Sequence, residues 1–313
     1  QQMVKGLAKA SAPCAALVVD NATGEVLAYV GSPSYFGASL GVTPLADRAG
    51  GNDGVQALRQ PGSTLKPFLY QLALEQGIIQ PNSILQDVPT HYAIPGAQLY
   101  SPIGFSETFQ GPVRLRAALG NSLNIPAVRL LEKVRVEAFL DRLHWLGFEH
   151  LEQSAEHYGL GLALGSGEVN LWELTQAYLT LAHGGDRTIQ LTATRQGRSL
   201  NQGSDAANSS GPLVQPELKP NTDVQATWSL ITDMLSDPHA RAAAFGVESV
   251  LNLPFPAAVK TGTSSDFRDT WTVGFTQDYT VATWVGNFDG SPMHHAQSLP
   301  EPFSCNSAGS QEQ

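Results

Sequence analysis

Several residue types and patterns are scarce in this chain of 313 residues, and each scarcity excludes a class of protein. The two cysteines, Cys14 and Cys305, lie near opposite ends and do not define a disulfide framework. No apolar run approaches the length of a membrane-spanning helix. Positive charge is scarce as well, because 18 lysines and arginines stand against 28 aspartates and glutamates, for a net charge of −10. Nucleic-acid binding is therefore not expected, since it requires a basic surface.

What the chain does contain is a β-rich segment near each end. Residues 14–20 and 25–30 are apolar or β-branched runs on either side of a turn that contains glycine, which predicts a hairpin. Near the other end, residues 257–263 predict a strand, and residues 270–276 and 279–285 predict a second hairpin.

The middle of the chain is predicted to be helical. Apolar residues recur at helical spacing in four segments, at residues 61–77, 113–148, 169–183 and 224–235. The second segment is interrupted at residues 120–124, where Asn124 is predicted to cap the next helix. Residues 31–60 and 80–110 are predicted to be loops. Residues 186–222 are polar and predict an exposed insertion with little to bury.

These elements predict one domain of residues 1–313 in the α/β class, of the α+β kind. Strands at both ends and helices between them suggest one antiparallel sheet built from both chain ends, with an inserted all-helical lobe. The sheet part comprises residues from about 12–60 and 250–293, and the lobe about 61–249. Residues 294–313 have no periodicity and are predicted to be a disordered tail.

Only six lysines occur in the chain, and two of them stand in motifs that suggest catalysis. Lys66 ends an S-x-x-K motif that begins at Ser63, and Lys260 begins a K-T-G motif. An S-x-N motif, from Ser122 to Asn124, lies between them in chain order. S-x-N also occurs twice in polar segments, and we regard both of those matches as accidental. The middle motif is therefore identified by its position rather than by its pattern.

The S-x-x-K motif suggests a nucleophile and its base. A serine hydroxyl is a weak nucleophile until a base takes its proton. Lys66 follows Ser63 by three residues, so a helix places both side chains on one face. An ordinary lysine has a pKa of about 10.4, and burial beside a second cation would lower that pKa. We expect Lys66 to lose its charge in this way, and Lys260 to stay charged.

The other motif residues suggest how a substrate would be held. Ser122 could pass a proton between Lys66 and a leaving amine, and the side-chain amide of Asn124 could bind a peptide group. We expect a substrate carboxylate to be received by the K-T-G-T segment, through Lys260, Thr261 and Thr263, and substrate backbone to lie against Gly262. The backbone amides of Ser63 and Thr263 are the predicted oxyanion donors.

The histidines offer no rival site. None of the eight lies near a G-x-S-x-G motif, so a Ser-His-Asp hydrolase is not expected. His294, His295 and Cys305 match no common spacing of metal ligands. We therefore expect neither a metal nor another cofactor.

The ordered trio of motifs is the signature of active-serine enzymes that react with penicillin. Residues 59–67 (RQPGSTLKP) resemble the active-serine segment of class A penicillin-binding proteins, and residues 245–276 resemble their transpeptidase domain more closely still. The resemblance covers about residues 12–293 and weakens in the insertion at 186–222. It implies the fold shared by penicillin-binding proteins and serine β-lactamases.

The resemblance also implies an activity and its partners. It implies a peptidoglycan D,D-transpeptidase on the periplasmic side of the bacterial inner membrane, in which Ser63 attacks D-Ala-D-Ala stem peptides and is acylated covalently by β-lactams. In the family, a glycosyltransferase domain and a membrane anchor precede this region on the same chain, and neither is found in this sequence. Because the chain begins at Gln1 without a signal peptide, we expect a fragment or a processed product.

One departure from the family concerns the end of the chain. In the family, the strand that ends near Gly286 leads into an apolar helix that packs on the sheet. In this chain, residues 289–293 lead into the polar tail at 294–313 instead. We expect the loss of that helix to expose one face of the sheet, and exposed apolar patches are sites of association.

Three alternative functions remain open. A D,D-carboxypeptidase would use the same trio with water as the acceptor. A non-catalytic β-lactam-binding or scaffolding domain would keep the fold without turnover. A class A β-lactamase needs a carboxylate to activate the deacylating water. No convincing Glu-x-x-Leu-Asn segment follows Ser122 at a suitable distance, so this last alternative ranks lowest.

Overall fold

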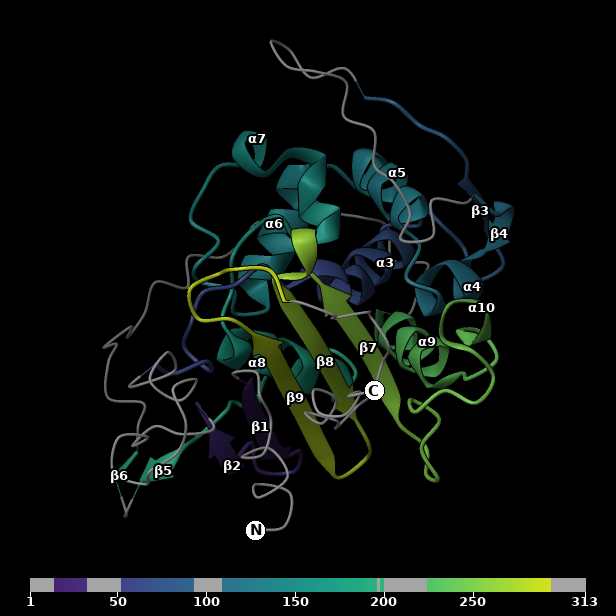
Figure 1. The fold of residues 1–313 in the computed structure, drawn as a ribbon. Helices are drawn as coiled ribbons and strands as arrows, with labels where there is room; N and C mark the ends of the chain where they lie inside the picture. The colour runs from purple at the N-terminus through teal and green to yellow at the C-terminus, as the bar shows by residue number, and fades with distance from the viewer. Residues whose placement is uncertain (1–13, 33–51, 93–108, 196–197, 200–223, 294–313) are drawn as a thin grey trace, which may run out of the picture.

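The computed structural model describes residues 14–32, 52–92, 109–195, 198–199 and 224–293 (Figure 1). The predicted tail at 294–313 and most of the predicted insertion at 186–222 lie outside the described residues. Among the described residues, no helix is long and apolar enough to span a bilayer.

A five-stranded antiparallel sheet joins segments from the two ends of the chain, in the order β2-β1-β9-β8-β7. The strands are β1 (Cys14–Asp20), β2 (Val26–Val30), β7 (Ala258–Thr263), β8 (Asp269–Phe275) and β9 (Tyr279–Gly286). β1 pairs with β9 from Cys14 opposite Val285 to Asp20 opposite Tyr279. The predicted sheet built from both chain ends is therefore confirmed.

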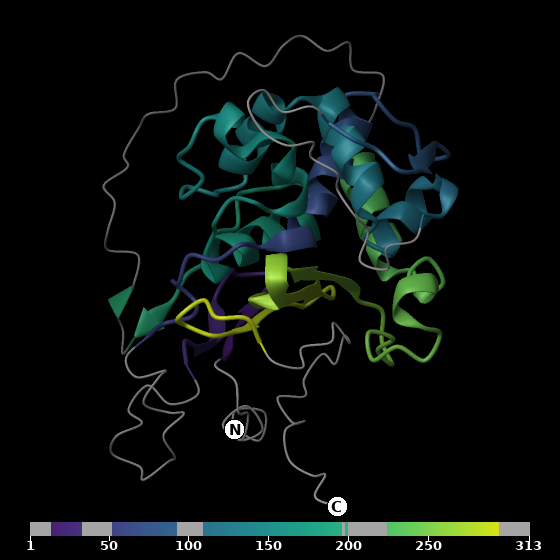
Figure 2. The same cartoon turned by 45° about the horizontal axis from the view of Figure 1, so that its top comes forward.

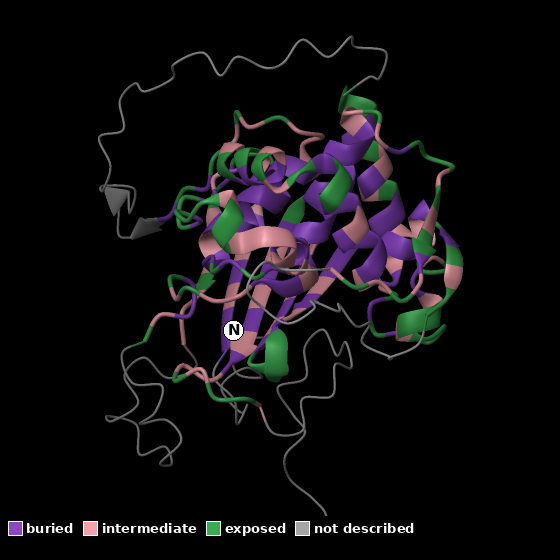
Figure 3. Ribbon diagram, turned by 90° about the horizontal axis from the view of Figure 1, so that it is seen from above, coloured by how far each residue is buried: buried purple, intermediate pink, exposed green. Residues whose placement is uncertain are grey.

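Strand alternation gives the sheet one deeply buried face. Trp271 pairs with Trp284 and Val273 pairs with Ala282, and all four side chains are fully buried. Helix α8 (Leu171–Ala182) packs on this face against β1, β8 and β9. Most of the helices lie on this side of the sheet (Figure 2), and the buried residues gather where the helices and the sheet meet (Figure 3).

The helical lobe lies between β2 and β7 in the sequence. Its α-helices besides α8 are α3 (Lys66–Glu75), α4 (Leu115–Gly120), α5 (Asn124–Val134), α6 (Val136–Trp145), α7 (Ala155–Tyr158), α9 (Val224–Ser236) and α10 (Ala242–Phe245). Shorter 3₁₀ turns are η2 (Gly62–Leu65) and η3 (Gly159–Leu164), and η4 (Ser265–Phe267) follows β7. The inserted helical lobe is thus confirmed.

Helix α3 forms the centre of the lobe, because it is buried on nearly every side. Phe68, Leu69 and Ala73 are fully buried, and the ring of Phe68 meets the edges of Phe148 and Tyr178. A helix that is apolar all round belongs in a core rather than at a surface. Burial of a side chain such as Phe68 contributes roughly 1.5–3 kcal/mol to stability. Lys66, at the start of α3, is therefore carried by a helix whose residues are almost all buried.

A half-buried arginine ties three helices of the lobe together. Arg142 of α6 donates to both carboxylate oxygens of Glu75, at 3.0 and 2.8 Å, and to Oε1 of Gln71 at 2.7 Å, both on α3. Its guanidinium also lies over the rings of Trp145 and of Trp228, which belongs to α9. The helix that carries Lys66 is thereby fixed to its neighbours.

Two local predictions are wrong. Residues 80–110, predicted as loop, contain the strand β3 (Ile84–Asp87), which pairs with β4 (Gly111–Arg114). Asn124 is the first residue of α5 and not its cap, because Leu123 holds the cap position without a side-chain hydrogen bond. The short strand escaped notice because four residues carry too little alternation to stand out among prolines.

The opposite face of the sheet is less deeply buried. Val18, Val281 and Val285 alternate with the buried side chains of β1 and β9, and they stay partly exposed. Beside β7 an apolar groove of about 670 Å³ is lined by residues that include Leu253, the exposed Phe255 and Val259. The prediction that a covering helix is missing concerns residues 294–313, which the structure does not describe.

Candidate active site

The three motifs meet at the seam between the helical lobe and strand β7. Ser63 lies in the turn η2 and Lys66 begins α3, while Ser122 lies between α4 and α5 and Lys260 lies on β7. Asn124 begins α5. The predicted trio is therefore assembled from segments that are distant in the sequence.

Two glycines let strand β7 and the turn η2 approach each other. A Cβ atom at Gly62, whose φ is +57°, would lie 2.4 Å from the carbonyl oxygen of Thr263. A Cβ atom at Gly262 would lie 2.3 Å from the carbonyl oxygen of Pro61. Both distances are too short for a side chain. Glycine at these two positions brings the Thr263 end of β7 next to the segment that carries Ser63.

The segment that precedes Ser63 is anchored to the sheet. The indole nitrogen of Trp271 on β8 donates to the carbonyl oxygen of Gln60 at 2.8 Å. The guanidinium of Arg59 donates to the carbonyl oxygen of Phe288 at 2.5 Å and lies over the ring of Trp284. These contacts fix the nucleophile segment from the sheet side.

Lys66 is fully buried, and its ammonium group points at the S-x-N motif. Its Nζ donates to the carbonyl oxygen of Ser122 at 2.6 Å and to Oδ1 of Asn124 at 2.7 Å, and it lies 3.5 Å from Oγ of Ser122. Burial lowers the pKa of Lys66 well below its usual range, and the charge of Lys260 lowers it further. The side chain of Asn124, predicted to bind substrate, here accepts a hydrogen bond from Lys66.

Lys260 approaches the same serine from the opposite side. Its Nζ donates to Oγ of Ser122 at 2.8 Å and to the carbonyl oxygen of Thr261 at 2.8 Å. Burial lowers the pKa of Lys260 to about 7. Burial therefore opposes the charge that the sequence analysis expects Lys260 to keep, and the role of Lys260 stays a prediction.

Ser122 connects the two lysines and does so in an unusual backbone conformation. Its φ is +57°, in the left-handed region that residues other than glycine seldom adopt. Such strain costs on the order of 1–3 kcal/mol and persists only when surrounding contacts hold it. Here the conformation presents the Ser122 carbonyl oxygen to Lys66 and the Ser122 hydroxyl to Lys260.

The remaining predicted residues border the seam without being buried in it. Thr261 and Thr263 on β7 are partly exposed, so a ligand can reach them. Ser63 is partly exposed too, and the hydrogen bonds of Lys66 and Lys260 among the described residues do not include its hydroxyl. Catalytic hydrogen bonds are often long before substrate binds, so the absence of this contact is compatible with activation of Ser63 by Lys66.

The chain is similar to known proteins. Residues 14–304 match the family model for the penicillin-binding protein transpeptidase domain. The chain belongs to this family. It is 32% identical to penicillin-binding protein 1C of Escherichia coli K12 over 92% of the chain and 33% of that protein. It is 31% identical to penicillin-binding protein 1A of Aquifex aeolicus over 86% of the chain and 33% of that protein.

Solved structures of penicillin-binding proteins share the fold. Penicillin-binding protein 1A of Haemophilus influenzae superposes with a TM-score of 0.66 at 24% identity, over 92% of this chain and 45% of that one. PonA1 of Mycobacterium tuberculosis in complex with penicillin V gives 0.67 at 23% identity, over 96% and 77%. The chain spans about a third of the length of the curated relatives it matches. The family is one of serine acyltransferases, and the resemblance found in the sequence is confirmed.

One buried cluster next to the K-T-G motif was missed by the sequence analysis. Asp269, at the start of β8, accepts hydrogen bonds from the hydroxyl of Ser264 at 2.8 Å and from the indole nitrogen of Trp284 at 3.0 Å. The amide of Asp269 donates to Oγ of Ser264 at 2.9 Å. This cluster closes the turn that directly follows Thr263. No pattern in the sequence marks it, since Asp269 and Trp284 meet only through strand pairing.

No metal site competes with this serine site within the described residues. No group of three or more histidine, cysteine, aspartate or glutamate side chains is placed there to hold an ion. Neither of the two buried lysines is hydrogen-bonded to a carboxylate. The polar side chains at the seam include the hydroxyls of Ser63 and Ser122, the amide of Asn124 and the two lysines.

Proposed function

We propose that this chain is a peptidoglycan D,D-transpeptidase domain whose nucleophile is Ser63. The observation that carries the proposal is the convergence of two buried lysines on the hydroxyl of Ser122, at the place where β7 packs against the turn that carries Ser63. A lysine whose charge is suppressed by burial can accept a proton at neutral pH, which an exposed lysine does poorly. Membership of the penicillin-binding protein transpeptidase family supports the same function.

In the first half of the reaction, the D-Ala-D-Ala amide is broken. Neutral Lys66 takes the proton of Ser63 as its oxygen attacks the carbonyl carbon, and the amides of Ser63 and Thr263 bind the oxyanion. The proton then passes from Lys66 through the hydroxyl of Ser122 to the leaving nitrogen. D-alanine departs as an amine, and the donor peptide stays on Ser63 as an ester.

In the second half, the amine of a neighbouring stem peptide attacks the ester. Lys66 accepts the proton that this amine loses, and Ser63 regains its proton as the new amide forms. A β-lactam would enter the first half in the same way, but its ring opening leaves the leaving nitrogen tethered in the site. Penicillins should therefore acylate Ser63 and remain.

The K-T-G-T segment would hold the substrate carboxylate. Carboxylate binding beside Lys260 favours the charged lysine and so raises its pKa again. Substrate binding would thus favour the charged form of Lys260, against the effect of its burial. Thr261, Gly262 and Thr263 would line the same edge of β7.

We infer the setting of the domain from the same family. Residues 1–313 would form one transpeptidase domain, with a sheet part at 12–60 and 250–293, a lobe at 61–249 and a disordered tail at 294–313. It would act on stem peptides on the periplasmic side of the inner membrane. Because the chain spans about a third of its curated relatives, it would work beside a glycosyltransferase domain of a longer protein.

Supplying a D-Ala-D-Ala pentapeptide together with an acceptor amine tests the proposal. Mass spectrometry should find the cross-linked product and an equal amount of D-alanine, and Ser63→Ala should produce neither. Release of D-alanine with hydrolysed peptide alone would identify a D,D-carboxypeptidase instead. A well-folded protein that forms neither product and no adduct with penicillin would be a non-catalytic binding domain.

A further inference from the structure

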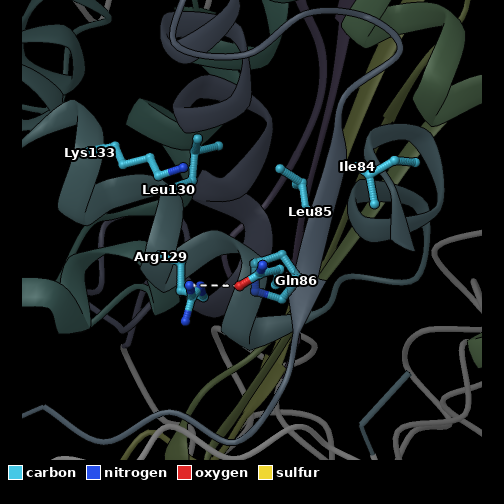
Figure 4. A pocket seen from close by; sticks show the side chains of 7 residues that line it. Ile84, Leu85, Gln86, Arg129, Leu130 and Lys133 are labelled. Carbon is cyan, nitrogen blue, oxygen red and sulfur yellow. Dashed lines mark hydrogen bonds between the residues drawn. The ribbon is translucent and has the colours of Figure 1, made fainter. Parts of the chain in front are cut away.

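A small pocket opens between helix α5 and strand β3, away from the seam. It has a volume of about 190 Å³ and is lined by Ile84, Leu85, Gln86, Pro126, Arg129, Leu130 and Lys133 (Figure 4). We call it the α5–β3 pocket. In Figure 4 the cationic side chains come from α5 and the aliphatic ones Ile84 and Leu85 from β3.

The α5–β3 pocket lies on the face of α5 that is opposite to the face bordering the catalytic seam. Asn124, Val128 and Leu131 recur at helical spacing on the face where Asn124 accepts from Lys66 of α3. Pro126, Arg129, Leu130 and Lys133 follow the i, i+3, i+4, i+7 pattern on the other face. The pocket is therefore a separate feature and not an extension of the transpeptidase site.

Arg129 is held in place by neutral groups alone. Its guanidinium donates to Oε1 of Gln86 at 2.9 Å and to Oγ1 of Thr90 at 3.2 Å. A guanidinium has five N–H donors, so donors remain for a ligand. One turn further along α5, Lys133 is exposed and makes no hydrogen bond or ion pair within the described residues. Both cations are available to an anion.

The charges on the neighbouring elements leave the pocket positive. Arg114 of β4 is exposed and pairs with Ile84 across the β3–β4 ladder. Of the nearby acids, Asp87 is buried and accepts from the amide of Gln110 at 2.9 Å. Glu132 accepts from the hydroxyl of Tyr92 at 3.5 Å. Neither acid lines the pocket, although the chain as a whole carries a net charge of −10.

The apolar wall of the pocket restricts the kind of anion. Ile84 is 57% exposed, which is unusual for a large aliphatic side chain on a strand, and the partly exposed Leu85 lies beside it, while Leu130, which also lines the pocket, is buried. A bare inorganic anion would bind the cations but would leave the aliphatic side chains of this wall exposed to water. An acidic side chain next to an aliphatic one would satisfy both parts, since a guanidinium fork matches a carboxylate.

We propose that the α5–β3 pocket binds an acidic peptide segment of a partner protein. A carboxylate of the segment lies between Arg129 and Lys133, and an adjacent aliphatic side chain packs on Ile84 and Leu85. The volume suits a side chain or two rather than a folded surface, so the segment binds as an extended peptide. This inference is independent of the proposed transpeptidase activity.

Fluorescence anisotropy with a labelled acetyl-Glu-Leu-Glu-Ile-Glu-amide peptide tests the site. The peptide should bind the whole chain, and Lys133→Glu should weaken binding by about tenfold or more, because a charge-assisted bond is replaced by repulsion. Ile84→Asp should weaken it as well. Lys133 makes no contact that the fold needs, so Lys133→Glu stays informative if Arg129→Glu fails to fold.

Matched controls separate this site from general charge attraction. Arg268→Glu makes the same change in net charge at an exposed arginine outside the pocket and should leave peptide binding within about twofold. The glutamine version of the peptide should not bind. Equal weakening by Arg268→Glu, full competition by inorganic phosphate, or no binding to a protein that still reacts with penicillin would each overturn the proposal.

Discussion

Helix α5 borders two sites that each hold a pair of cationic side chains, and the two pairs differ in how far water reaches them. Lys66 and Lys260 lie at most 3% exposed in the catalytic seam, where burial lowers the pKa of both. In the α5–β3 pocket, Arg129 is partly exposed and Lys133 is exposed. Burial turns a lysine into a group that can exchange a proton, whereas exposure leaves a charge that can attract an anion.

Replacing a lysine by arginine should therefore slow acylation when the lysine lies in the catalytic seam, and leave the acylation rate unchanged when it lies in the α5–β3 pocket. Lys66→Arg keeps the charge but removes the base, because a guanidinium is not deprotonated in proteins. The rate of acylation by penicillin should fall by about 10³-fold, within the range attributed to general-base catalysis. Lys133→Arg should leave that rate unchanged. Stopped-flow measurement of adduct formation would give both rates, and retained acylation in Lys66→Arg would remove Lys66 from the role of base.

Close packing at the seam provides a second comparison, between two glycines. Gly62→Ala places a Cβ atom against the Thr263 carbonyl, so we expect acylation to fall by about 10²-fold as the geometry of the seam shifts. Gly77 has a φ of +68° but no atom within 4 Å of its added Cβ. Gly77→Ala should cost only about 1 kcal/mol of stability from its backbone conformation. Equal effects of both changes on acylation and on urea unfolding would show that packing at Gly62 is unimportant.

Removing the charge of Lys260 should move the pH dependence of acylation. Lys260→Gln eliminates the repulsion that lowers the pKa of Lys66, so the pKa of Lys66 rises. Lys66 is active when neutral, so the rise in rate with pH should occur at a higher pH in the variant. The profile of the second-order acylation rate against pH measures this. If the acidic limb of this pH–rate profile is the same in the variant and the wild type, Lys66 and Lys260 are not coupled electrostatically.

The lowered pKa values also predict how stability depends on pH. Between pH 7 and about 10.4 the unfolded chain keeps Lys260 protonated while the folded chain increasingly does not, so the unfolded state binds more protons. The free energy of unfolding contributed by Lys260 therefore rises with pH across this window, and its penalty is fully present below the folded-state pKa; the lowered pKa of Lys66 acts in the same direction. Urea unfolding of Lys260→Met should show a weaker rise than the wild type.

The smallest effect is expected at Asp269. In Asp269→Asn, one side-chain oxygen becomes an amide donor, so Ser264 and Trp284 can no longer both donate to this side chain. The turn after Thr263 should loosen, and acylation should slow by about tenfold while noncovalent penicillin binding stays nearly constant. Rapid kinetics separates the two steps. A change confined to the melting temperature would leave Asp269 with a role in stability only.

The sequence predicted the strands of the five-stranded sheet and the helices that carry the motifs, because periodicity and motif order are local properties. The sequence did not predict the features that depend on contacts between segments distant in the chain. The hydrogen bond between Trp271 and Gln60 joins residues 211 positions apart, and no local pattern reveals it. Asn124 follows the preference of asparagine for helix starts, yet its side chain is drawn to Lys66 instead of capping the helix. The positive φ of Ser122 likewise follows from contacts with two lysines on other elements.

The proposed mechanism at the catalytic seam depends most directly on Ser63 being the residue that is acylated. Incubating the protein with a fluorescent penicillin, digesting it and mapping the label by mass spectrometry tests this in one measurement. The account predicts a single long-lived adduct on the peptide that contains Ser63, and none in Ser63→Ala. A label that is lost rapidly would indicate a β-lactamase, and a folded wild type that stays unlabelled, or a Ser63→Ala variant that is labelled as before, would contradict the account.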